Sequence, residues 1–218
     1  MNDTSIKPSL SSRIQTVRSA SGIEAWLIED YTVPLIAMEI AMRGGSSQDP
    51  ESLPGTASFL AGLLDEGAGP YDSAAFHDRL DDYAIELGFS ASRDLITGHL
   101  RTLSKHRAEA FDMVRLALTE PRLDEEPVER VRAQMLASLR HDVNDPDTRA
   151  NRAWFESAFA GHAYARPSKG TFESLPNITR DHLVAYRDQV FARDTLKLAV
   201  VGAIDATTLA SELEAIFV

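Results

Sequence analysis

The chain contains no cysteine, no long apolar run and no excess of basic residues. Without cysteine it can form no disulfide, no thiolate metal site and no thiol nucleophile. No apolar run approaches the roughly 20 residues that cross a membrane as a helix. The first residues, MNDTSIKPSLSSRIQ, lack the basic and then apolar segments of a signal peptide. These features are compatible with either the bacterial cytoplasm or the periplasm.

The charge balance of the chain is acidic. Its 33 Asp and Glu residues against 22 Lys and Arg residues give a formal net charge of −11. Proteins that bind nucleic acid or anionic membranes generally present a basic surface, so the sequence predicts neither partner. The remaining composition, 44% hydrophobic and 25% charged, is typical of a globular protein.

Several familiar catalytic and nucleotide-binding motifs are also missing. No serine lies in a G-x-S-x-G elbow, and VVGAID has a single glycine, so neither a dinucleotide fingerprint nor a phosphate-binding loop is present. The six histidines form no metal-binding pattern. His77 and Asp81 share helical spacing, but His77 lies off the apolar face of its helix and is expected to be solvated.

The order of strands and helices predicts an α+β fold. Strands are expected at 13–19, 23–30 and 33–45, and the third is apolar at nearly every position, which predicts cover on both of its faces. A helix is expected at 54–66, and a second begins at Asp72 or Ser73 with one apolar face made of Phe76, Leu80, Tyr83, Ala84 and Leu87. A hairpin that turns at 92–94 follows, and then helices at 104–118, 124–142, 146–160 and 179–191. The chain ends with a strand over TLKLAVVG and a last helix capped by Asp205.

This order predicts a mixed, mostly antiparallel sheet of five or six strands with helices packed on it. Residues 1–12 are polar and are expected to form a flexible tail. The rest of the chain has no internal repeat and no linker-like segment. We therefore expect residues 13–218 to form a single domain.

The stretch GTASFLAGLLDEGAG predicts an amphipathic helix capped by Ser52, with Pro54 in its first turn and Gly67 just beyond its end. Its apolar stripe, which should face a core, consists of Phe59, Leu60, Leu63 and Leu64.

A second face of this helix carries only small residues, namely Ser58, Ala61 and Gly62. Their spacing is that of H-x-x-E-H, in which two histidines bind zinc and the glutamate handles protons. Small residues at these positions are also compatible with a simpler role, the close approach of another helix or strand.

The order of several motifs resembles the N-terminal half of the M16 (pitrilysin/insulinase, processing-peptidase-like) family. These motifs are AMRGGSSQDP, the helix after Gly55, NDP, GHAYARPSKGTFESL, NIT…L…Y and LAVVGAID. The resemblance covers residues 13–218. It implies the domain fold shared by LuxS and the mitochondrial processing peptidases, and a native chain that continues into a second, related domain.

The resemblance also implies where the active site of a working relative would lie. Its two zinc-binding histidines correspond to Ser58 and Gly62, its general base to Ala61, and its carboxylate ligand, seven positions beyond Glu129, to Leu136. Glycine, alanine and leucine offer no ligand atom, and a lone serine hydroxyl is a poor one. Without zinc there is no activated water. We therefore predict no catalytic, metal-binding or cofactor-binding residue and no activity of the chain alone.

Within the resemblance, the chain is similar to the zinc-less member of a two-chain M16 peptidase. This implies a non-catalytic subunit that partners a zinc-bearing M16 homologue, closes its chamber and holds peptide or unfolded protein, for instance by pairing at a sheet edge. The alternative is a structural or assembly protein that kept the fold and lost its link to proteolysis. For a third possibility, an enzyme with other chemistry, the sequence supplies no residues.

Overall fold

The computed structural model describes residues 10–217, so most of the tail expected at 1–12 lies outside the described residues. Six strands form one sheet in the order β1-β2-β6-β3-β5-β4. They are β1 (Gln15–Arg18), β2 (Glu24–Glu29), β3 (Leu35–Arg43), β4 (Glu86–Ala91), β5 (Leu95–Leu103) and β6 (Lys197–Gly202). Only the β2–β6 pair is parallel, which confirms the mixed, mostly antiparallel sheet.

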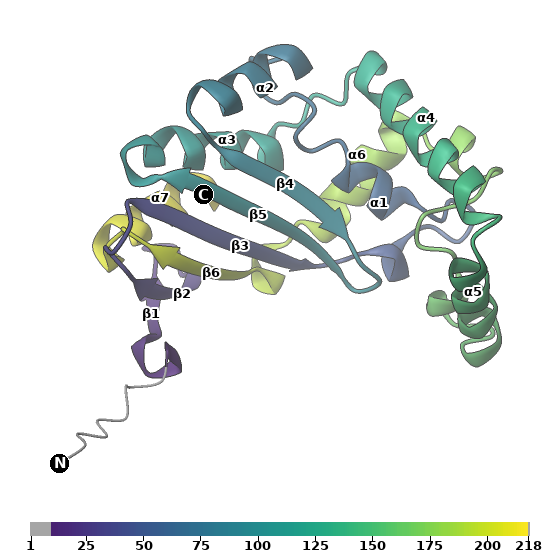
Figure 1. The fold of residues 1–218 in the computed structure, drawn as a ribbon, viewed down its shortest axis with the longest axis horizontal. Coiled ribbons are helices and arrows are strands. Elements are labelled where there is room, and N and C mark those ends of the chain that lie inside the picture. Colours follow the sequence, from purple (N-terminus) through teal and green to yellow (C-terminus); the bar gives the residue numbers. More distant parts are fainter. Residues whose placement is uncertain (1–9, 218) are drawn as a thin grey trace.

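Seven α-helices accompany the sheet within the described residues (Figure 1). α3 and α7 pack on one face of the sheet, whereas α4 and α5 lie beyond the end where the β4–β5 hairpin turns. The helices are α1 (Thr56–Ala61), α2 (Ser73–Asp82), α3 (Arg107–Thr119), α4 (Glu125–Asp142), α5 (Pro146–Ala158), α6 (Arg180–Val190) and α7 (Ala206–Phe217). None of the helices within residues 10–217 is both long and apolar enough to cross a membrane.

The core lies between the helices and one face of the sheet. Along β3 every second side chain is buried, as the two-residue period of a strand requires. The buried set is Ile36, Met38, Ile40 and Met42, each at most 4% exposed.

The prediction that β3 is covered on both faces is wrong for the described residues. β3 is central and both of its edges are paired, but only one face of the sheet carries helices. The other face is open, and several large apolar side chains on it are between 38% and 55% exposed, namely Trp26, Leu35, Leu95 and Val201. On this face β3 carries Leu35, Ala37 and Ala41 together with the charged Glu39 and Arg43.

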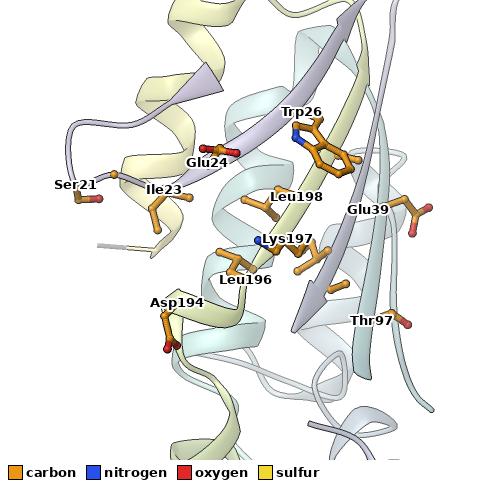
Figure 2. Close-up of a pocket in the computed structure, with 14 residues that line it drawn as sticks. Ser21, Ile23, Glu24, Trp26, Glu39, Thr97, Asp194, Leu196, Lys197 and Leu198 are labelled. Atoms are coloured by element: carbon orange, nitrogen blue, oxygen red, sulfur yellow. The ribbon is translucent and has the colours of Figure 1, made fainter. Parts of the chain in front are cut away.

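The open face has a hollow of about 520 Å³ over β2, β6 and β3. Figure 2 shows Trp26, Glu39 and Lys197 on neighbouring strands around it. The small side chains of Ala41 and Ala199 are among those that line it. The hollow is therefore a feature of an uncovered sheet surface.

Two predicted helices are shorter than expected. α1 ends at Ala61 and gives way to turns, although the periodicity suggested a helix over 54–66. α2 begins after Asp72, whose carboxylate accepts from the Ala75 N–H as predicted, but it ends at Asp82. Tyr83 and Ala84 therefore lie beyond the helix, and Ala84 takes a left-handed conformation that ends it.

The segment after Ala84 turns directly into β4. Leu87, expected on the apolar face of the second helix, is a buried residue of this strand. The hairpin at 92–94 and the cap at Asp205, which accepts from the Thr208 N–H, are as predicted.

Candidate functional site

The candidate site is the short helix α1 and the segments packed around it. The four apolar residues of its predicted stripe are buried to 1% exposure or less, which confirms that this face points into the core. They are Phe59, Leu60, Leu63 and Leu64. The face that carries Ser58 and Gly62 points instead toward α4 and the loop at 166–174.

The start of α1 is held by Asp49 and not by Ser52, the cap that the sequence predicted. The Asp49 carboxylate accepts from the N–H groups of Gly55 at 2.7 Å and of Ala57 at 2.8 Å. Asp49 is 4% exposed, and this burial raises the pKa of its carboxyl from 3.8 to about 6. The two N–H groups and the nearby Arg166 guanidinium oppose that rise in pKa.

Gly55, at the start of α1, lets the loop at 166–174 approach the helix. Its φ of 97° is left-handed, and a Cβ added there would lie 2.7 Å from Cα of Gly170. Ser174 locks the same contact, because its hydroxyl donates to the carbonyl of Pro54 at 2.7 Å. The backbone of this loop is therefore fixed against the first turn of α1.

This loop occupies the side of α1 that would face a metal. The Ser58 hydroxyl donates to the main-chain carbonyl of Ser168 at 2.8 Å. Ala61 is 2% exposed. A Cβ added to Gly62 would lie 3.4 Å from Cγ1 of Val131 on α4, in ordinary contact. Each of the three positions thus has a structural neighbour.

The predicted third position, Leu136, lies on α4 and is half-buried against the core. Its neighbours Met135 and Leu139 are placed in the same way, so the side of α4 that carries Leu136 is apolar there and Leu136 itself offers no ligand atom. Within residues 10–217 no three His, Asp or Glu side chains are grouped so that they could hold a metal. The residues around α1 do not fit a zinc ion.

The strand β4 lies beside α1 and is an edge of the sheet. Among the described residues it pairs only with β5, so the backbone groups along its outer edge have no partner there. Such an edge can accept an added strand.

Gly45 brings the hairpin of β4 and β5 close to this site. Its φ is 75°, and a Cβ there would lie 2.4 Å from the carbonyl oxygen of Ser92. The Tyr186 hydroxyl, buried on α6, donates to the Gly45 carbonyl at 2.8 Å. Burial raises the pKa of Tyr186, so this donor stays protonated.

Three of the histidines make short-range hydrogen bonds. His77 is exposed and its ring nitrogen contacts the carbonyl of Ser73. His162 caps a short 3-10 helix by accepting from the Tyr164 N–H, and His182 belongs to the capping box of α6.

The structure thus defines an α+β domain whose helix α1 carries small residues at the spacing of H-x-x-E-H. Comparison with known sequences agrees with this class: the family described as Insulinase (Peptidase family M16) matches residues 26–171. The chain belongs to the M16 peptidase family.

Individual relatives include proteins described as inactive. The chain is 28% identical over 174 residues to the "Non-peptidase homolog YmxG" of Helicobacter pylori, covering 80% of this chain and 40% of that protein. The crystal structure of a "peptidase M16 inactive domain" from Pseudomonas fluorescens superposes with a TM-score of 0.88 at 25% identity, covering 94% of this chain and 50% of that one.

A relative described as a subunit is also similar. The chain is 24% identical over 169 residues to the "Mitochondrial-processing peptidase subunit beta" of Lentinula edodes, covering 76% of this chain and 35% of that protein. The chain therefore spans half or less of the length of these relatives.

Sequence reasoning missed Asp49 and two arginines near the loop, Arg93 and Arg166. The Asp-Pro pair that follows GGSSQ and precedes Gly55 is a local signal for the cap. The arginines come together only through the tertiary fold, although Arg166 lies within the motif GHAYARPSKGTFESL.

Proposed function

We propose that this chain is part of a zinc-less, non-catalytic M16 subunit that partners a zinc-bearing M16 homologue in peptide or protein processing. One observation carries the proposal. The frame around α1 is intact and tightly packed, while the positions for zinc and base hold Ser58, Ala61, Gly62 and Leu136. In this proposal the zinc belongs to the partner, and this chain completes the chamber and holds substrate.

The β4 edge supports the holding role. Its unpaired backbone lies beside α1, and an extended peptide could add there as a further strand. Backbone hydrogen bonds of this kind do not depend on side-chain sequence. They suit a subunit that handles varied unfolded peptides.

The open sheet face supports the partnering role. Its exposed apolar side chains, among them Trp26 and Val201, are of the kind that marks a contact surface. The relative described as a processing-peptidase subunit gives a precedent for assembly.

Reconstitution tests the proposal. The full-length protein and a zinc-bearing M16 homologue from the same source are purified separately, mixed at micromolar concentration and run on a size-exclusion column. Cleavage of an unfolded peptide is then measured for each chain and for the mixture. We expect a stable complex that cleaves the peptide, while neither chain does so alone.

Two results would contradict the proposal. The chains could elute separately while the zinc-bearing chain is fully active by itself. Alternatively, this protein could co-purify from its source with an assembly that has no peptidase. Either result favours the structural or assembly role.

A further inference from the structure

A cleft of about 590 Å³ lies between the C-terminal end of α4, helix α5 and the loop at 165–173. Ser168 is one of its lining residues, and its carbonyl accepts the hydrogen bond from Ser58. The cleft therefore adjoins α1. The loop that lines the cleft also packs against the face of α1 that carries Ser58.

Basic side chains outnumber acidic ones in the cleft, because Arg93, Arg149, Arg152, Arg166 and Lys169 line it beside Asp142, Asp147 and Glu173. Two of its basic residues are paired: Lys169 contacts Asp142 at 2.8 Å and Arg152 contacts Glu156 at 2.7 Å. Three others, Arg93, Arg149 and Arg166, have no carboxylate within 4.0 Å among residues 10–217. In a chain with a net charge of −11 this concentration of unpaired arginines is unexpected.

Two of these arginines are held in place by the fold. The guanidinium carbon of Arg93 lies 3.4 Å from the centroid of the Phe155 ring, so its plane is fixed by the aromatic side chain. Arg166 donates through Nη2 to the carbonyl of Ser47 at 2.9 Å. The Nε atoms of both are buried and have no partner within the described residues. The guanidinium groups are thus held in place, but each keeps a hydrogen-bond donor without a partner among the described residues.

The chemistry of the lining identifies the ligand class. A planar guanidinium group binds a carboxylate through paired hydrogen bonds, and its plane is already set here. Apolar side chains lie in the same cleft, including Val143, which is 55% exposed, and Phe172, which is 43% exposed. They could take an apolar side chain next to that carboxylate.

We propose that this cleft binds a carboxylate of the held peptide, from an acidic side chain or from the chain terminus, beside an apolar residue. The inference rests on the proposed function, because it supplies the substrate class for the peptide-holding role. It gives the subunit a preference for acidic or C-terminal peptide segments.

Fluorescence anisotropy with three labelled peptides of about ten residues tests this site on the full-length protein. The first carries Glu-Leu and an amidated terminus, the second has Gln in place of Glu, and the third has Gln and a free terminus. We expect the first or the third to bind about tenfold more tightly than the second, as a charge-assisted pair of hydrogen bonds would give. Tighter binding of the first peptide would identify an acidic side chain as the source of the carboxylate, and tighter binding of the third would identify the chain terminus.

Variants locate the effect. Arg93→Gln and Arg166→Gln should each remove the preference and leave binding of the second peptide unchanged. Arg149→Gln, on the exposed surface of α5, should reduce the preference without disturbing the Phe155 contact. Arg43→Gln loses the same charge from an exposed position on β3, outside the cleft, and should keep the preference.

Three outcomes overturn the inference. Equal binding of all three peptides leaves the holding role standing but removes the carboxylate site. If Arg43→Gln lost the preference to the same extent, the preference would come from net charge alone. Failure of every peptide to bind removes the proposed holding role, and the carboxylate site with it.

Discussion

The hydroxyl of Ser58 donates to the main-chain carbonyl of Ser168, 110 positions later in the chain, across a distance of 2.8 Å. In the H-x-x-E-H spacing, position 58 would carry the first zinc-binding histidine. The hydroxyl instead ties α1 to the loop at 166–174. This face of α1 thus serves as a packing surface.

This contact sets an order of stability effects on the two faces of α1. Leu63 is 1% exposed, so Leu63→Ala should cost about 2–5 kcal/mol through lost transfer energy and the cavity left behind. Ser58→Ala removes one hydrogen bond and should cost about 0.5–1.5 kcal/mol. Urea unfolding of both variants measures the difference. A larger loss for Ser58→Ala would mean that the loop contact matters more than the core.

A second prediction concerns the close approach of the loop to α1. Gly55→Ala places a methyl group 2.7 Å from Cα of Gly170 in a left-handed conformation. Gly161→Ala is the matched control, because its φ is 79° but nothing lies within 4 Å of the added Cβ.

Gly161→Ala should lower the free energy of unfolding by about 1 kcal/mol, through conformational strain alone. Gly55→Ala should lower it clearly more, because the backbone at Gly170 must also move. Thermal unfolding midpoints of the two variants give the comparison. Equal losses would show that the loop yields freely.

Metal content gives a third prediction. The residues at α1 and α4 supply no zinc ligands, so the dialysed protein should contain far less than one zinc per chain. Addition of EDTA should leave the unfolding midpoint unchanged. Elemental analysis with a thermal scan measures both, and one tightly held zinc per chain would contradict the prediction.

A fourth prediction follows from the pKa of Asp49, which burial raises from 3.8 to about 6. The folded protein then holds this proton more tightly than the unfolded chain. Asp49 therefore contributes most to stability below about pH 4, and that contribution is lost as the pH rises through about 6. The difference between the two pKa values corresponds to at most about 3 kcal/mol in the free energy of unfolding.

Asp49→Asn isolates this effect, because every other titrating group is common to both proteins. We expect the free energy of unfolding of the wild type, relative to that of the variant, to fall between pH 4 and pH 7. Urea titrations at four pH values measure it. A difference that stays level or grows with pH would mean that the N–H groups of Gly55 and Ala57 outweigh burial.

Much of the fold was predictable because local periodicity reports burial. The stripe with Phe59 and Leu63 lies on one stretch of the chain, and Asp72 and Asp205 each cap the helix that directly follows them. The end of α1 was not, because the stripe continues past Gly62 while the backbone turns. Nor was the open face of β3, since apolar content alone does not reveal which face the helices cover.

The site was predictable only where the chain itself carries the spacing. Ser58, Ala61 and Gly62 follow one helix, so their register could be compared with a zinc motif. Asp49 caps that helix from a separate turn, and Arg93 and Arg166 come from different segments of the fold. Contacts of this kind form between segments that are distant in the sequence, and the periodicity of one segment does not reveal them.

The last prediction concerns the unpaired edge of β4. If extended peptide adds to this edge, the outward N–H groups of Glu86–Ala91 become hydrogen-bonded and should exchange more slowly with deuterium. The sheet has a second edge strand, β1 at Gln15–Arg18, far from α1 and at the other end of the strand order. It serves as an internal control in the same sample. Hydrogen exchange with and without saturating unfolded peptide should slow in β4 and stay unchanged in β1. Protection of both edges would indicate non-specific strand addition, and protection of neither would place the peptide away from the sheet edges.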